Sequence, residues 1–129
     1  MLESRLVSRP LEFILARQWS ELLSVPVLLF DADLRLVFFN DAAGLYLGRS
    51  FNETGSMDPQ EWRAAFPMTD ATPEGSPLAA AQDSGVPVQA DLTLESLAGR
   101  RRVRVTAWPI DGLTGSRVGL LATLHPTTT

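Results

Sequence analysis

The pattern of apolar and polar positions predicts an amphipathic helix over residues 10–24, PLEFILARQWSELLS. The segment opens with a proline suited to a first helical turn, and one stripe of the helix would carry Leu11, Ile14, Leu15, Gln18 and Leu22. Phe13, Trp19 and Leu23 lie off that stripe, so the helix has more apolar surface than one contact buries. The sequence leaves two partners open for this additional apolar surface: another subunit, or the rest of the domain.

From Pro26 on, the spacing of the apolar residues changes from the period of a helix to that of a strand. Two apolar runs, 27–30 and 34–39, flank Asp31-Ala32-Asp33, which predicts two strands joined by a tight turn. Aspartate is favoured in such turns because its side chain bonds to nearby backbone N–H groups, and we therefore interpret this acidic pair as a turn and not as a metal site. Asn40 and Asp41 then supply caps for a short helix that ends at Gly48.

The middle of the chain is less regular. Residues 49–75 are rich in Gly, Pro and Asn, and the best helical candidate there is 58–66, where Asp58 caps and Pro59 begins the first turn. Residues 75–85, GSPLAAAQDSG, predict a further helix with a serine cap, a proline at the first position and a terminal glycine.

The last third predicts three strands. Apolar and polar residues alternate over 88–95, which indicates a half-buried strand. In the next strand, 101–109, three small apolar residues face one way, while Trp108 shares the other face with arginines. After a turn at 111–115, residues 117–124 are apolar on both faces, which predicts a central strand.

Composition narrows the class of protein. The chain has 129 residues, enough for one domain with a single core. It contains no Lys and no Cys, which excludes Walker-type phosphate loops, lysine Schiff bases, thiolate catalysis and disulfides, and fits a reducing, cytoplasmic location. A net charge of -4 argues against a nucleic-acid surface despite the basic run 100–104, and no apolar run is long enough for a membrane-spanning helix or a signal peptide.

Four segments in this order resemble a PAS domain, the small sensor fold of signalling proteins. They are the opening hairpin and helix VLLFDADLRLVFFNDAA, the helix and strand SPLAAAQDSGVPV, the final hairpin RRRVRVTAWPIDGLTGSRVGLL, and the leading helix. The resemblance implies an α+β fold with a five-stranded antiparallel sheet in the order 2-1-5-4-3 and helices on one face. It divides the chain into a flanking helix over 1–24, a PAS-like domain over 25–124 and a C-terminal tail over 125–129.

Alternation and the resemblance together imply a ligand pocket on the helix-covered face. Its predicted lining is Leu28, Phe30, Leu36, Phe38, Tyr46, Trp62, Phe66, Leu78, Val103, Val105, Ala107, Leu121 and Thr123. Since nearly all of these are apolar, a ligand is expected to be apolar or aromatic and uncharged. The alternative, a core filled by its own aromatic side chains with no ligand site, stays open.

The opposite face of the sheet is predicted to dimerise. Trp108 would stand on this face, extended by Val118, Leu120, Ala122 and Leu124, and the leading helix is its natural cover. The predicted interface consists of Leu11, Ile14, Leu15, Trp19, Leu22, Trp108 and Leu120.

No cofactor or metal is expected. His125, the single histidine, lies outside the helices where haem-binding relatives carry their ligand, and covalent flavin adducts need a cysteine. Noncovalent flavin stays open. The scattered carboxylates lack EF-hand spacing, and no serine lies in a G-x-S-x-G context.

These observations predict a noncatalytic bacterial sensory or interaction module that forms homodimers and, unless its core is filled by its own side chains, binds a small apolar or aromatic ligand. Two alternatives remain at this stage: a pure dimerisation scaffold, and a small enzyme or carrier with an apolar cavity. Pro126, close to the end of the last predicted strand, disfavours a helix that continues directly into an output domain.

Overall fold

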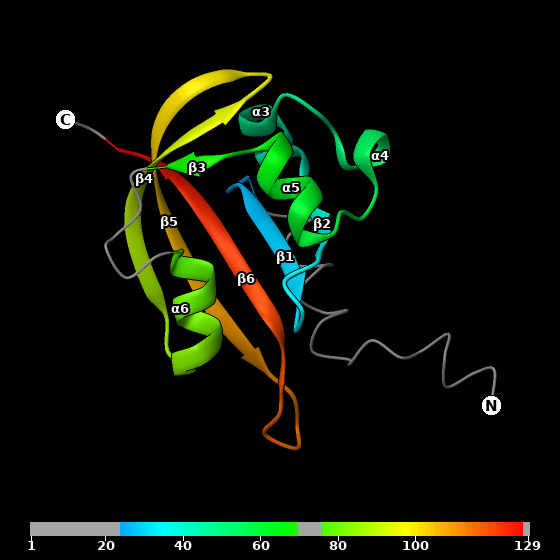
Figure 1. Ribbon diagram of the computed structural model, residues 1–129, viewed down its shortest axis with the longest axis vertical. Coiled ribbons are helices and arrows are strands. Elements are labelled where there is room, and N and C mark those ends of the chain that lie inside the picture. The colour runs from blue at the N-terminus through cyan, green and yellow to red at the C-terminus, as the bar shows by residue number, and fades with distance from the viewer. Residues whose placement is uncertain (1–23, 70–75, 128–129) are drawn as a thin grey trace.

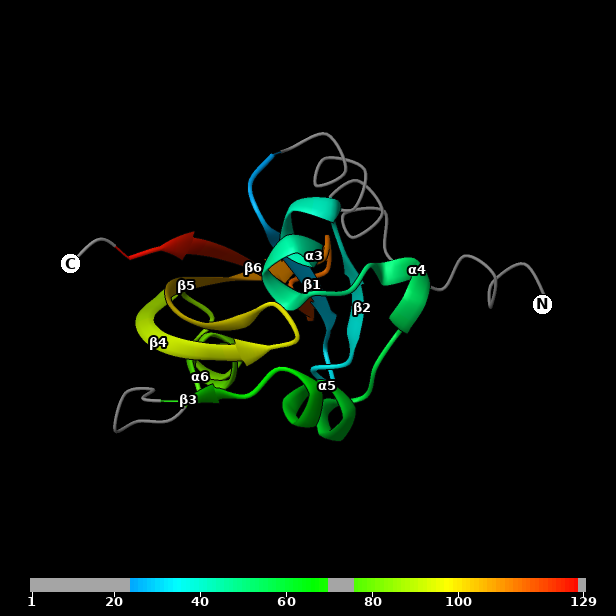
Figure 2. The ribbon, with the colours of Figure 1, turned by 90° about the horizontal axis from the view of Figure 1, so that it is seen from above.

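The computed structural model describes residues 24–69 and 76–127, which form a curled antiparallel sheet with helices over one face (Figures 1 and 2). The strands lie in the order β2-β1-β6-β5-β4-β3. In chain order the elements are β1 (Val27–Asp31), β2 (Leu36–Phe39), α3 (Asp41–Leu47), α4 (Phe51–Thr54), α5 (Pro59–Ala65), β3 (Met68–Thr69), α6 (Pro77–Ser84), β4 (Val88–Ser96), β5 (Gly99–Asp111) and β6 (Arg117–Pro126).

The predicted α+β class and strand path are confirmed, with one correction to the strand count. β6 lies between β1 and β5, so the strand with two apolar faces is central as expected. The sixth strand is β3, two residues that pair with Thr93 and Leu94 of β4 at the sheet edge. It falls in the irregular region, and a strand of two residues has no alternation from which it could be predicted.

The predicted helix caps are confirmed. The Asp58 carboxylate accepts from the Glu61 N–H at 2.9 Å, and the Glu61 carboxylate accepts from the Asp58 N–H at 2.9 Å, which forms a capping box at the start of α5. Ser76 caps α6, and Gly85 ends it in the left-handed conformation with φ 77°.

Asn40 joins the start of β1 to the start of α3. Its side-chain oxygen accepts from the Ala43 N–H at 2.9 Å and from the Val27 N–H at 3.0 Å. Its amide donates to the Val25 carbonyl at 2.8 Å, and the side chain is buried. A single residue therefore satisfies backbone groups of both elements where the helix leaves the sheet.

The acidic turn between β1 and β2 has the structure expected of it. The Asp31 carboxylate accepts from the Asp33 N–H at 2.9 Å and from the Arg35 N–H at 3.0 Å. Leu34 completes the turn with φ 63°, a left-handed conformation that is uncommon for a leucine. Two helices hold this turn from outside, because the Trp62 indole donates to the Leu34 carbonyl at 2.8 Å and the Gln82 amide donates to the Ala32 carbonyl.

The face assigned to β6 from the sequence is wrong. Ala122 pairs with Ala107 and Leu124 with Val105, so Leu120, Ala122 and Leu124 face the helices and are buried. Leu121 and Thr123 lie on the opposite face. Both faces of this strand are apolar, and a shift of one residue exchanges them, so alternation alone could not choose between them.

A register shift in the first hairpin moves Phe38 to the outer face as well. Leu29 pairs with Phe38, whereas the next residue, Phe30, pairs with Leu36. The extra residue in β2 interrupts the alternation, so Phe39 joins Leu36 in the core and Phe38 packs on the other side.

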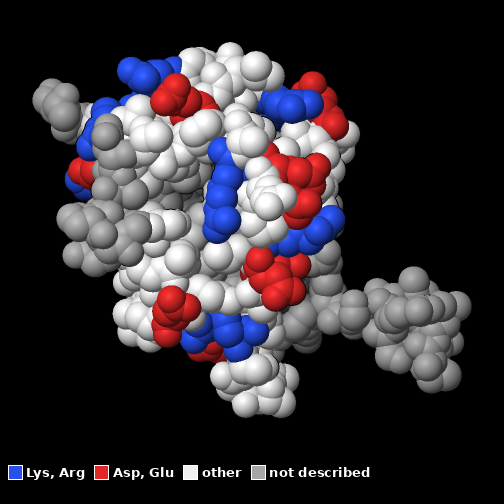
Figure 3. Space-filling model, viewed as in Figure 1, with Lys and Arg blue, Asp and Glu red and all other residues white. Residues whose placement is uncertain are grey.

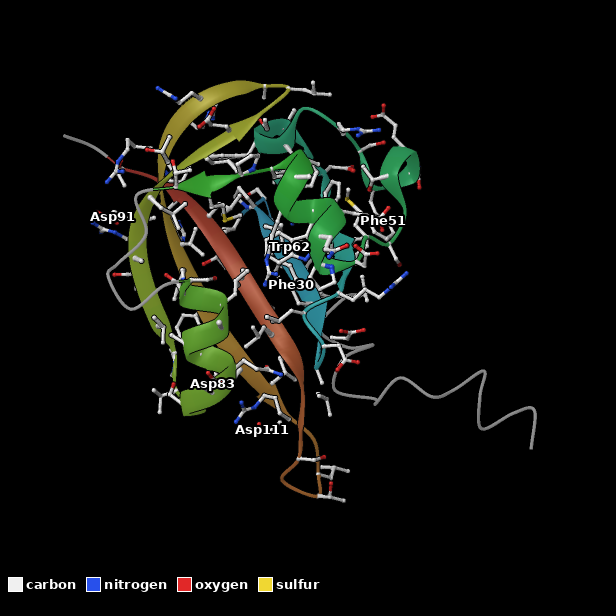
Figure 4. The ribbon with its side chains drawn as sticks, viewed as in Figure 1. Phe30, Phe51, Trp62, Asp83, Asp91 and Asp111 are labelled. Atoms are coloured by element: carbon white, nitrogen blue, oxygen red, sulfur yellow. The ribbon has the colours of Figure 1, made fainter. Side chains whose placement is uncertain are left out.

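The main core fills the space between the sheet and its helices. Its large side chains are fully buried, among them Phe30, Phe39, Phe66, Leu92 and Leu124. The Phe30 and Trp62 rings meet edge to face between β1 and α5, with centroids 5.2 Å apart (Figure 4). Side chains of the domain itself therefore fill this part of the interior.

Candidate functional site

A cavity of about 340 Å³ lies where α5, β3, β4 and the start of α6 meet. Its walls are mostly apolar and are formed by Trp62, Arg63, Phe66, Pro67, Met68, Ser76, Pro77 and Leu92. The volume is at the small end of the range for ligand sites, which suits a molecule of about one ring.

The aromatic residue of the α5 wall is held on two sides. Trp62 is 5% exposed, its ring contacts Phe30, and its indole N–H donates to the Leu34 carbonyl. α5 ends at Phe66, whose N–H bonds to the Trp62 carbonyl, and the following proline carbonyl accepts from the Glu95 N–H at 2.9 Å. These bonds fix the turn from α5 into β3 beside the cavity.

The opposite wall is the first turn of α6. The Ser76 hydroxyl accepts from the Leu78 N–H at 3.1 Å, and Pro77 follows the cap without an N–H of its own. Leu92 of β4 forms the floor and is fully buried. The cavity is thus built by elements that lie far apart in the sequence.

The predicted pocket residues divide into four groups. Trp62 and Phe66 line the cavity. Seven others contribute to the packed core without bordering the cavity: Leu28, Phe30, Leu36, Leu78, Val103, Val105 and Ala107. Tyr46 packs at the core margin below the guanidinium of Arg101, at 4.7 Å from the ring centroid, and Phe38, Leu121 and Thr123 are on the other face of the sheet.

Six lining residues were missed by the sequence-based prediction: Arg63, Pro67, Met68, Ser76, Pro77 and Leu92. Leu92 lies in the strand predicted over 88–95, and Ser76 and Pro77 lie at a predicted helix start, so their positions along the chain were available. The sequence did not indicate that these residues meet around one cavity, because their meeting depends on the pairing of β3 with β4.

The outer face of the sheet carries a second apolar cluster. Val27, Leu29, Val37 and Phe38 are buried there, with Phe51, Ile110 and Leu121 packed against them. Trp108 lies opposite Leu121 in the β5–β6 register and is 47% exposed. Of the predicted interface, Leu120 is wrong because it is buried in the inner core, and Leu11, Ile14, Leu15, Trp19 and Leu22 lie outside the described residues.

The basic run on β5 is paired with residues of β4. Arg104 forms a bidentate contact with Asp91, with Nε–Oδ1 2.7 Å, and Arg100 lies 3.5 Å from Glu95. Over the described part of the face seen in Figure 3, acidic and basic side chains are interspersed. Arg100 and Arg104 are therefore accounted for by cross-strand ion pairs, and Arg101 by its contact with the Tyr46 ring.

The Asp91–Arg104 pair predicts a pH-dependent contribution to stability. The hydrogen bond from Arg104 lowers the pKa of Asp91 below the usual value of 3.8. Because the folded-state pKa is the lower one, the stabilisation is complete above the unfolded-state pKa and is lost as the pH falls through the folded-state pKa. A carbon-detected NMR titration of Asp91 should give a midpoint below 3.8 that returns to the usual value in Arg104→Gln; an unchanged midpoint would contradict the pairing.

The described ranges 24–69 and 76–127 contain neither a cluster of metal ligands nor a membrane-spanning helix. Their His, Asp and Glu side chains nowhere gather in threes as metal ligands would. Within the same ranges, each helix is too short or too polar to cross a bilayer.

The described geometry, a curled antiparallel sheet with its last strand in the centre and short helices over one face, defines a class of domain. A family model described as the PAS fold matches residues 20–129. The chain belongs to this family, as the resemblance of its four segments predicted. A comparison with curated proteins finds no match.

Solved structures share the fold at low identity. The PAS domain of nitrogen regulation protein NR(II) from Vibrio parahaemolyticus aligns with a TM-score of 0.64 at 19% identity, over 88% of this chain and 98% of that chain. The light-state dimer of the fungal blue-light photoreceptor Vivid gives 0.60 at 19%, over 78% and 76%. An RNA-binding Light-Oxygen-Voltage receptor gives 0.65 at 18%, and the match covers 90% of this chain but 32% of the receptor.

Proposed function

We propose that this protein is a noncatalytic sensory module that binds a small molecule in the cavity between α5, β3 and α6. The observation that carries the proposal is the cavity of about 340 Å³ with Trp62, Phe66 and Leu92 in its walls. It combines apolar surface with a few polar groups, as small-molecule sites do. The solved structures that share the fold support a signalling role, since they include a receptor, a photoreceptor and a regulation protein.

The hydrogen bonds that hold the β1–β2 turn provide a route by which a ligand in the cavity acts on the sheet. α5 contacts this turn through Trp62 and α6 through Gln82, and both helices border or begin at the cavity. A ligand that changes the spacing of the two helices would therefore act on the turn. From there the effect passes through β1 to β6, its neighbour in the sheet.

Binding is tested first by native mass spectrometry of the protein as purified, which reports retained small molecules and subunit number together. A retained ligand supports the proposal. Bare chains, in a protein that also fails to bind any member of a fragment library, would contradict it.

Filling the cavity should abolish binding. Met68→Trp places a larger side chain at the cavity wall and is expected to weaken fragment binding at least tenfold, measured by ligand-observed NMR. Thr69→Trp is the matched control, because this neighbouring residue is exposed and does not line the cavity. Equal losses in both variants would point to a general disturbance of β3 and contradict the assigned site.

Homodimerisation through the outer face of the sheet is a further part of the proposal. The same interface would be used if the protein were a dimerisation scaffold that binds no ligand. The observation that favours it is Trp108, 47% exposed beside an apolar cluster. The predicted flanking helix over 10–24 remains the proposed partner of this face. Bacterial origin and cytoplasmic location stay predictions from the sequence.

Trp108→Ser should weaken the dimer at least tenfold in sedimentation experiments, because it removes the largest exposed apolar side chain of this face. Leu113→Ser is the control, since Leu113 is 94% exposed at the β5–β6 turn, away from the cluster. A monomeric wild-type protein, or a dimer unaffected by Trp108→Ser, would contradict the proposed interface.

A further inference from the structure

Among the described residues that line the cavity, Arg63 is the one with a charged side chain. It follows Trp62 on α5, and its guanidinium carbon lies 5.2 Å from the centroid of the Trp62 ring. Arg100, Arg104 and Arg117 each contact a carboxylate, at 3.5, 2.7 and 2.6 Å. Among the described residues, Arg63 contacts the aromatic ring and no carboxylate.

The polar groups of the cavity are therefore hydrogen-bond donors. The Arg63 guanidinium carries five N–H groups in a planar fork. Ser76 is the second polar lining residue, and its oxygen already accepts from the Leu78 N–H, which leaves the hydroxyl proton to be donated. The remaining described lining residues are aromatic, aliphatic, proline and methionine, and within the described part of the chain none of them carries a carboxylate.

This arrangement suits one class of ligand better than the neutral apolar one expected from the sequence. We propose that the cavity binds a small organic acid, with its ring or alkyl body against Trp62, Phe66 and Leu92. Its carboxylate pairs with the Arg63 fork, and the Ser76 hydroxyl is the second donor. Guanidinium binds carboxylates in a bidentate geometry, and stacking on an indole holds the fork in place before the ligand arrives. The proposal rests on the proposed function, because it assigns a ligand class to the same cavity.

The size of the cavity limits the acid. A volume of about 340 Å³ fits a single ring or a short chain with its acid group, and not a dinucleotide or a haem. One arginine matches one carboxylate, so a monoacid is expected to bind better than a diacid of the same body.

The test compares acids with their own amides on the chain of 129 residues. The probes are phenylacetate, 3-phenylpropionate, benzoate and hexanoate, each paired with its primary amide, at millimolar concentration in ligand-observed NMR. The amide keeps the shape and removes the charge. Each bound acid is expected to exceed its amide at least tenfold in affinity.

Three variants test whether Arg63 causes the preference for the acid over the amide. Arg63→Met keeps an apolar stem beside Trp62 and should abolish the acid-over-amide preference while amide binding persists. Arg63→Lys keeps the charge without the fork and should retain part of the preference. Arg35→Met is the control for overall charge, because Arg35 is exposed and does not line the cavity.

The possible outcomes separate the two proposals. If acids and amides bind equally, or if Arg63→Met keeps the preference, the acid-binding inference is overturned while the sensory cavity stands. If no probe binds and the purified protein retains no small molecule, both are overturned.

Discussion

Replacing Leu120 with alanine is expected to lower the free energy of unfolding by about 3 kcal/mol. Leu120 is fully buried in the core between the sheet and the helices, so the truncation leaves a cavity that the neighbouring side chains cannot fill. Its backbone is fixed between β1 and β5, through pairing with Phe30 and Pro109, which limits relaxation. The measurement is urea denaturation followed by circular dichroism, with the m-value checked for constancy.

Leu121 is the matched control, because it is the same residue type in the same strand, one position further. It lies on the outer face and is only partly buried, so Leu121→Ala should cost about 1 kcal/mol. The sequence-based assignment predicts the reverse order. Equal losses, or a larger loss at Leu121, would show that the register of β6 differs from the one described here.

Asn40→Ala is expected to have the second large effect, a loss of about 3 kcal/mol. The change removes the cap of α3, which by itself costs about 1 kcal/mol. It also leaves the Val27 N–H and the Val25 carbonyl without this partner, and unsatisfied backbone groups at a buried position add about 1–3 kcal/mol. Thermal and urea unfolding measure the loss.

The control for this prediction is Asn52→Ala. Asn52 is exposed in the first turn of α4, where Ser50 and Glu53 form the capping box, so the loss should stay below about 0.5 kcal/mol. Asn40→Asp keeps the acceptor oxygen but not the amide donor to Val25, and should fall between wild type and Asn40→Ala. A loss at Asn40→Ala no larger than at Asn52→Ala would contradict the proposed junction between β1 and α3.

Local chemistry made much of the fold predictable. Asp58, Ser76 and Gly85 end or begin helices through hydrogen bonds and backbone conformations that involve only the next few residues. Asp31 acts in the same way in the β1–β2 turn. Such signals survive in the sequence because donor and acceptor are near neighbours along the chain.

The candidate site was predictable only in part, for the opposite reason. Trp62 and Phe66 were identified as pocket residues because the PAS resemblance implies a pocket that is lined in part by helices. Arg63 follows directly on a buried residue, which by helical period puts it towards solvent, and its neighbours across the cavity belong to β3 and α6. No periodicity along the chain reports that β3 joins the edge of β4 and closes the cavity there.

The sequence by itself determined the order of the elements other than α4 and β3, the caps of α3, α5 and α6, the acidic turn and the central position of the last strand, because these follow from short-range hydrogen bonds and from the balance of apolar residues. The tertiary structure alone decided which face of β6 meets the helices, where Phe38 points and which residues enclose the cavity. These properties depend on strand register and on one bulge opposite Leu29, and a register is a relation between segments that are distant in the chain.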